Sequence, residues 1–99
     1  MAAYTGTKVA SFPQAGIAVY RATVAAADGA GPHTVTHDLP AAIFPSGAPR
    51  VYAVVVSSTS NSNTQSVNVQ SVSTSAITFI LSAAPASGTT VNVDFLVGP

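Results

Sequence analysis

The segment HTVTHDL, residues 33–39, comes closer than any other part of the chain to a chemical site in residue type and spacing. It places His33 and His37 four positions apart, and Asp38 follows the second histidine. On a helix, residues four apart lie on one face and can share a metal ion. On a strand, a rise of ~3.3 Å per residue separates the two side chains by about 13 Å, which is too far for one ion.

All three residues between the histidines are β-branched, which favours a strand. We therefore predict no metal site here, and nothing in the sequence calls for another cofactor. His37 falls on the apolar face of this strand and is predicted to be a buried neutral imidazole, hydrogen-bonded to backbone. His33, at the strand start, is predicted to be exposed to solvent.

The remaining patterns do not indicate catalysis. No serine lies in a GxSxG turn, and the glycines at residues 29–31 lack the spacing of a phosphate-binding loop. The chain has only three carboxylates, Asp28, Asp38 and Asp94, and they fall in separate segments, so a paired acid and base is not expected. We predict that the chain is not an enzyme.

Composition points to association. The chain has 99 residues, 47% of them hydrophobic, which suits one domain with one modest core. It carries six charged residues and no net charge, and none lies between Arg50 and Asp94. So little charge favours assembly with other copies or with a partner. Because there is no basic patch, nucleic acid is not an expected partner.

Polar residues interrupt every apolar run before it reaches the ~18 residues of a membrane span, so no membrane contact is expected. The first residues also lack the apolar core of a signal peptide. Residues 1–15 are predicted to form an extended N-terminal arm in which Lys8 is the only charge. Its apolar anchors are Tyr4, Val9 and Phe12.

Residues 16–99 are predicted to form a single β domain. Residues 16–27 combine alanines that suit a helix with β-branched residues that suit a strand, and we predict a strand. RVYAVVVSS, residues 50–58, is apolar on both faces, which indicates a central strand or one covered by another subunit. In SVNVQSV the alternation slips between Val69 and Val72, which predicts a bulge or a strand end.

The last two predicted strands alternate strictly. Their inward positions predict a core of Ile77, Phe79, Leu81, Val91, Val93 and Phe95. Short strands separated by turn signals, without a clear helix, predict an all-β fold. We expect a small antiparallel β-sandwich or barrel of jelly-roll-like form, with the arm at residues 1–15.

The segments TVTHDL, RVYAVVV, SVNVQSV, SAITFILSAAPASGTT and VNVDFLV, between His33 and Gly98, resemble a small β-sandwich module of bacteriophage virion proteins. This module is found at the ends of tail fibres. Used as a free-standing small domain, it would resemble a capsid decoration, or cement, protein. The resemblance implies a homotrimer on the capsid surface of a virion, with the major capsid protein as partner.

We therefore expect a structural virion protein that stabilises the assembled capsid. The alternative is a tail-fibre or tail-tip module that binds a host receptor or glycan, through an exposed aromatic residue or the polar loop at residues 57–65. The chain has no tryptophan, and its candidate sugar platforms, Tyr4, Tyr20, Phe44 and Tyr52, are each expected to be packed. The candidate partner-binding residues are Tyr4, Lys8, Val9, Phe12, Arg50 and Tyr52.

Overall fold

The computed structural model describes residues 3–12, 17–39, 48–58 and 65–99. Its strands are β1 (Ala3–Thr5), β2 (Thr7–Phe12), β3 (Ile17–Ala25), β4 (His33–Thr36), β5 (Arg50–Ser58), β6 (Val67–Val72), β7 (Ala76–Leu81) and β8 (Thr90–Gly98). One turn of 3₁₀ helix, η2 (Ala26–Asp28), follows β3. The all-β prediction is confirmed, and the ambiguous segment after residue 16 is a strand.

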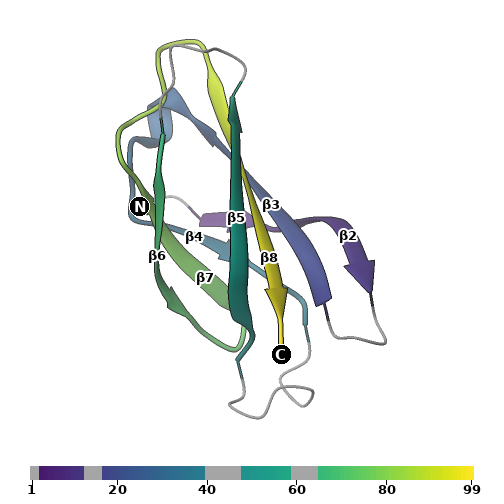
Figure 1. Cartoon of the computed structure of the whole chain (residues 1–99). Helices are drawn as coiled ribbons and strands as arrows, with labels where there is room; N and C mark the ends of the chain where they lie inside the picture. The colour runs from purple at the N-terminus through teal and green to yellow at the C-terminus, as the bar shows by residue number, and fades with distance from the viewer. Residues whose placement is uncertain (1–2, 13–16, 40–47, 59–64) are drawn as a thin grey trace.

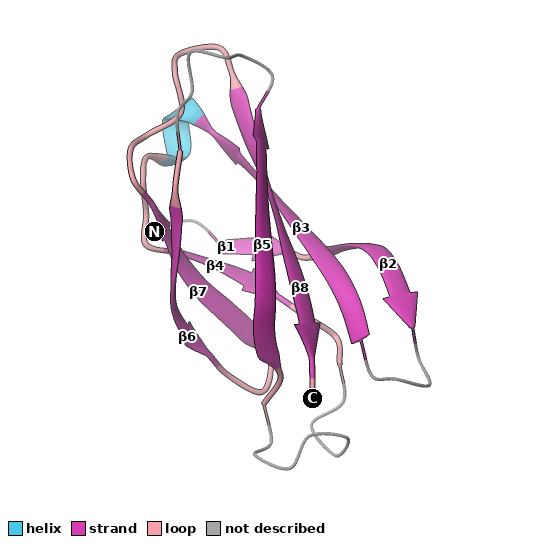
Figure 2. Ribbon diagram, viewed as in Figure 1, coloured by secondary structure: helices cyan, strands magenta, loops and turns pink. Residues whose placement is uncertain are grey.

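The described strands form two packed sheets (Figures 1 and 2). Sheet I has the order β1-β4-β7-β6, and sheet II has the order β2-β3-β8-β5. Apart from the parallel pair β1–β4, the described pairings are antiparallel. The protein is therefore a small, mostly antiparallel β-sandwich.

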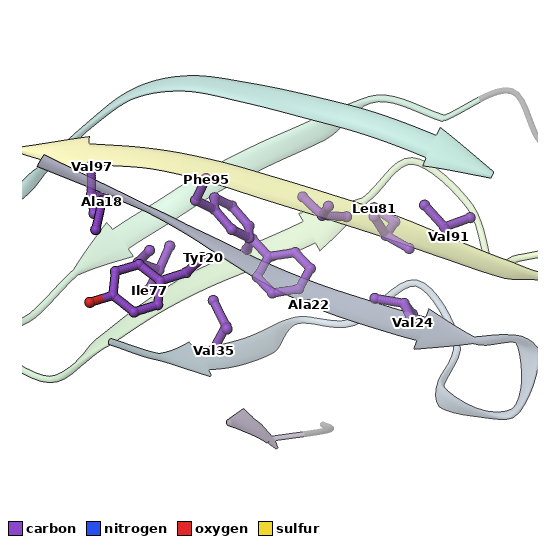
Figure 3. Packing of buried hydrophobic residues seen from close by; sticks show 12 residues of the cluster. Ala18, Tyr20, Ala22, Val24, Val35, Ile77, Leu81, Val91, Phe95 and Val97 are labelled. Carbon is purple, nitrogen blue, oxygen red and sulfur yellow. The ribbon is translucent and has the colours of Figure 1, made fainter. Parts of the chain in front are cut away.

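The core lies between the sheets and follows from period-2 alternation (Figure 3). The six predicted core residues of β7 and β8 are all buried, and Phe79 packs on Phe95 with ring centroids 5.1 Å apart. Alternate residues of β3 extend the layer: Ala18, Tyr20, Ala22 and Val24. The predicted slip in SVNVQSV is confirmed as a register shift between Val69 and Ser71.

The N-terminal segment differs from the predicted arm. It is extended, but β1 pairs with β4 and β2 pairs with β3, so residues 3–12 are edge strands of the two sheets. Two features hide this in the sequence. β1 has only three residues, and the pairing of β2 shifts register between Lys8 and Ala10, which breaks the alternation.

Of the two alternatives predicted for the strand RVYAVVVSS, the central position in a sheet is wrong. The strand forms β5, which lies at the edge of sheet II and not at its centre (Figure 1). Val51, Val54 and Val56 pack against the core, while Tyr52 and Val55 are exposed. Tyr52 and Val55 therefore present apolar surface to solvent on the second face of this strand. Among the described residues, no helix has the length and apolar character needed to cross a membrane.

Candidate protein-binding face

The two histidines of HTVTHDL each belong to a separate polar cluster. In the first cluster, the Tyr4 hydroxyl donates to Asp28 at 2.6 Å, and the backbone N–H of Ala25 donates to the same oxygen at 3.2 Å. His33 Nε2 lies 3.0 Å from the carbonyl oxygen of Gly29, and the Tyr4 ring meets the His33 ring edge-on at 5.7 Å. The hydrogen bond from Tyr4 lowers the pKa of Asp28. This cluster fastens β1 to the connection between β3 and β4.

The second cluster lies just after the other end of β4. The Tyr20 hydroxyl donates to the Asp38 carboxylate, and Lys8 Nζ lies 3.1 Å from the same oxygen. Burial, together with the bond to Asp38, raises the pKa of Tyr20 to about 12, and that bond lowers the pKa of Asp38. His37 Nε2 lies 3.0 Å from the carbonyl oxygen of Ser73. The cluster joins β2, β3 and the end of β4.

These contacts test the predicted burial of His37 and the predicted exposure of His33. His37 is buried and hydrogen-bonded to a backbone carbonyl, as expected. The predicted exposure of His33 is wrong: its side chain is 0% exposed, because Tyr4 and Phe79 cover it. In the described part of the chain, no three residues of the metal-binding types come together.

Most of the charged side chains form ion pairs or hydrogen bonds with other residues of the same chain. Arg21 and Asp94 form a two-pronged ion pair on sheet II, with nitrogen–oxygen distances of 2.7 and 2.9 Å. Lys8 is paired with Asp38, and Asp28 accepts from Tyr4. Within the described residues, the exposed Arg50 side chain has no ion-pair or hydrogen-bond partner. Arg50 is therefore the one charged side chain of the described residues that is left without a partner inside the molecule.

The outward face of sheet II carries such groups. One row of opposed residues crosses all four strands and is entirely apolar: Ala10, Val19, Leu96 and Ala53. Beside it, Gly98 lies between the side chains of Ile17 and Tyr52. Tyr52 is 59% exposed and Val55 is 61% exposed. We call Ile17, Val19, Tyr52, Ala53, Val55 and Leu96 the apolar patch.

The rest of this face is mainly polar, and several of its side chains bond to one another. The row that ends at Val55 contains the Arg21–Asp94 pair, and in the following row the Thr23 hydroxyl donates to the side-chain oxygen of Asn92 at 2.8 Å. An exposed apolar surface bordered by polar residues is typical of a protein-binding site. The patch, with Arg50 at its margin, is the candidate site.

The outward face of sheet I has a different chemistry. One row across its strands consists of Ala3, Thr34, Thr78 and Ser71, and the next consists of Thr5, Thr36 and Ala76. Hydroxyl groups dominate this face, and such groups are readily solvated. The two faces of the sandwich are therefore unequal, and sheet II is the better suited to contact another protein.

The structure divides the six predicted binding residues. Arg50 and Tyr52 lie together on β5, and both are exposed. Tyr4 and Lys8 each contact an aspartate of the same chain, so their contacts in this structure stabilise the fold. Val9 is 44% exposed but lies on β2, at the opposite edge of sheet II, and the Phe12 side chain lies outside the described residues.

Sequence reasoning missed the residues of the patch on β3 and β8. Ile17, Val19 and Leu96 alternate with buried residues, so they occupy outward positions that are usually polar. The available signal was that both strands have apolar residues at odd-numbered and at even-numbered positions. The earlier expectation that Tyr52 is packed is wrong, because the strand that carries it is at an edge.

Comparisons with known proteins found no family model, no curated protein and no solved structure that matches this chain. The resemblance to a phage virion module therefore stays a prediction from sequence. The geometry that bears on function is the unequal character of the two faces.

Proposed function

We propose that this chain is a structural virion protein that binds the outer surface of an assembled phage capsid and stabilises it. Its contact with the major capsid protein is the apolar patch of sheet II. The observation that carries this proposal is the contrast between the apolar patch on sheet II and the hydroxyl-rich face of sheet I. The resemblance described above supplies the virion setting.

The physical task of such a protein is differential binding. Apolar surface removed from water contributes roughly 25 cal/mol per Å². If the patch contacts more than one capsid subunit, the full area is buried only on the assembled lattice. Binding then stabilises the lattice by mass action. A rigid sandwich suits this role, since little conformational entropy is lost when it docks.

A role in binding rather than catalysis fits the use of the titratable side chains. Both tyrosines of the polar clusters donate to aspartates, and the third aspartate is paired with Arg21. These contacts connect strands and turns, and the two tyrosine–aspartate bonds lie at the ends of β4 in sheet I. In this proposal the chain has no reaction to perform.

The test uses a matched pair of substitutions at outward, half-buried positions. Val19→Lys places a charge in the middle of the patch, and Thr34→Lys places the same charge on sheet I. Heads lacking the protein are mixed with each variant, and co-sedimentation and heat resistance are measured. We expect Val19→Lys to weaken binding by about tenfold or more and Thr34→Lys to leave it nearly unchanged. Equal binding by both variants would remove sheet II from the contact.

The tail-tip alternative is kept because of one observation: Tyr52 presents an aromatic ring that is 59% exposed. Aromatic side chains presented in this way can stack on sugars. Most of the polar loop at residues 57–65 lies outside the described residues. Binding to host cells or to a glycan array, lost in Tyr52→Ala and absent towards heads, would favour this function over the first.

A further inference from the structure

The edge strand β5 differs from the other edges of the sandwich. Natural sheets protect edges with short strands, charges, bulges or polar residues. β1 has three residues, β2 contains Lys8 and a register shift, and β6 is shifted and rich in Asn, Gln and Ser. β5 is nine residues long and uncharged after Arg50, and its register shift lies near its start.

We infer that β5 pairs antiparallel with β5 of a second copy of this chain, with the two-fold axis at Val55. The inference stands apart from the capsid proposal, because it concerns the free protein. Antiparallel pairing of identical strands is isologous, so each copy contributes the same surface. It would join two four-stranded sheets into one continuous sheet.

The register of β5 suits this axis. Ala53 to Ser57 pair regularly with β8, beyond the shift at Tyr52. With Val55 opposite its own copy, Ala53 faces Ser57 and Val54 faces Val56 of the partner. Each facing pair then has the same parity, so the inward and outward sides of the two sheets coincide. β-branched residues opposite one another favour such cross-strand pairing.

The distribution of charge along β5 also permits pairing with a second copy of the strand. Between Val51 and Ser58 there is no charged residue, so no like charges meet across the axis. Arg50 lies five residues from Val55, which places the two copies of Arg50 about 33 Å apart at ~3.3 Å per residue. That separation is several Debye lengths at physiological salt, about 8 Å each.

The paired length sets the strength of the contact. Five facing residues span only about 17 Å, so the contact is smaller than the ~800 Å² per partner of a standard interface. The dimer should therefore be weak and should form in a concentration-dependent way. A threefold assembly, which the resemblance implies, cannot arise from this contact alone.

The experiment places opposite charges at the axis. Sedimentation velocity is measured across a wide concentration range for the wild type, Val55→Lys, Val55→Asp and their equimolar mixture. We expect the wild type to dimerise and each variant alone to dimerise at least about tenfold more weakly, because like charges are directly opposed. The mixture should recover a heterodimer. Val9→Lys, on the opposite edge of sheet II, is the matched control and should dimerise like the wild type.

The outcomes separate cleanly. A wild type that stays monomeric at every concentration overturns the inference, and so does a trimer that Val55→Lys leaves intact. Variants that weaken association without recovery in the mixture would place Val55 away from the two-fold axis. Circular dichroism and melting of each variant show that any loss of association is not a loss of fold. None of these measurements involves capsids, so failure here is distinct from failure of the capsid proposal.

Discussion

At the scale of single residues, five of the six charged side chains of this protein form ion pairs or hydrogen bonds within its own fold. Tyr4 of the edge strand β1 bonds to Asp28 near the start of β4, and Tyr20 of the inner strand β3 bonds to Asp38 just after the end of β4. Each tyrosine ring also packs beside one of the two histidines. The segment that first suggested chemistry is therefore a structural joint between the sheets.

The Tyr20–Asp38 bond predicts a stability difference that depends on pH. The pKa of Asp38 is lowered in the folded protein, so its contribution is present at neutral pH and is lost as pH falls below about 4. The pKa of Tyr20 is raised from 10.0 to about 12, so its contribution is present below pH 10 and is lost as pH rises towards 12. Wild type and Tyr20→Phe should therefore differ most at neutral pH, and the gap should narrow at both extremes.

Urea unfolding midpoints measured across pH for both proteins check this expectation. Asp38→Asn serves as a second variant that removes the acceptor charge while keeping a similar side-chain shape. A gap between wild type and Tyr20→Phe that stays constant from acid to alkaline pH would show that the hydroxyl does not depend on the ionised carboxylate.

At the scale of strands, the sequence could predict the features that follow from the alternation of apolar and polar residues, and little more. The buried residues of β7 and β8 follow from strict alternation, and the shift in β6 follows from its interruption. The pairing of β1 and β2 did not follow, because three residues and a shifted strand give no period to detect. The burial of His33 depends on Tyr4, which is 29 positions away in the chain, and no local pattern reports such a contact.

The candidate site as a whole could not be predicted from the sequence for the same reason. Alternation shows which residues share a face, but it does not show which strand stands at a sheet edge. RVYAVVVSS is apolar on both sides whether it is central or peripheral, and only the topology places it at the edge. Half of the patch therefore became visible only once β3, β8 and β5 were known to be neighbours.

The junction between β1 and β2 yields a prediction at this scale. Gly6 joins a strand of sheet I to a strand of sheet II, and its N–H donates to the carbonyl oxygen of Thr36 at 3.1 Å. A Cβ at Gly6 would lie 2.1 Å from that same oxygen. Gly6→Ala must therefore displace backbone, and we expect it to lower the free energy of unfolding by about 1–3 kcal/mol.

Chemical denaturation measures this cost directly. Thr5→Ala, at the exposed neighbouring position, is the control and should change the free energy of unfolding by less than about 0.5 kcal/mol. Equal stability of Gly6→Ala and the wild type would mean that the junction has room to move.

At the scale of the whole molecule, the two outer faces of the sandwich differ in chemistry. Sheet I presents hydroxyl groups, and sheet II presents the patch. In the proposed dimer, the patches of two copies would lie on the same side of one continuous sheet. If the chain binds a capsid as proposed, two linked contacts on the repeating lattice gain avidity, so a weak dimer and a modest patch can together give firm attachment.

The low charge of the molecule predicts how that attachment responds to salt. The chain has no net charge, and the ion pair on sheet II is satisfied within the protein, so docking through the patch involves little long-range attraction. Raising NaCl from about 50 to about 500 mM should therefore change the affinity for heads by less than about threefold, since apolar burial is not screened. Arg50→Gln, which removes the exposed charge beside the patch, should flatten any remaining dependence. Titration of labelled protein onto heads at several salt concentrations measures both. A loss of tenfold or more in high salt would mean that charges of the capsid, met by Arg50 or by residues outside the patch, dominate the contact.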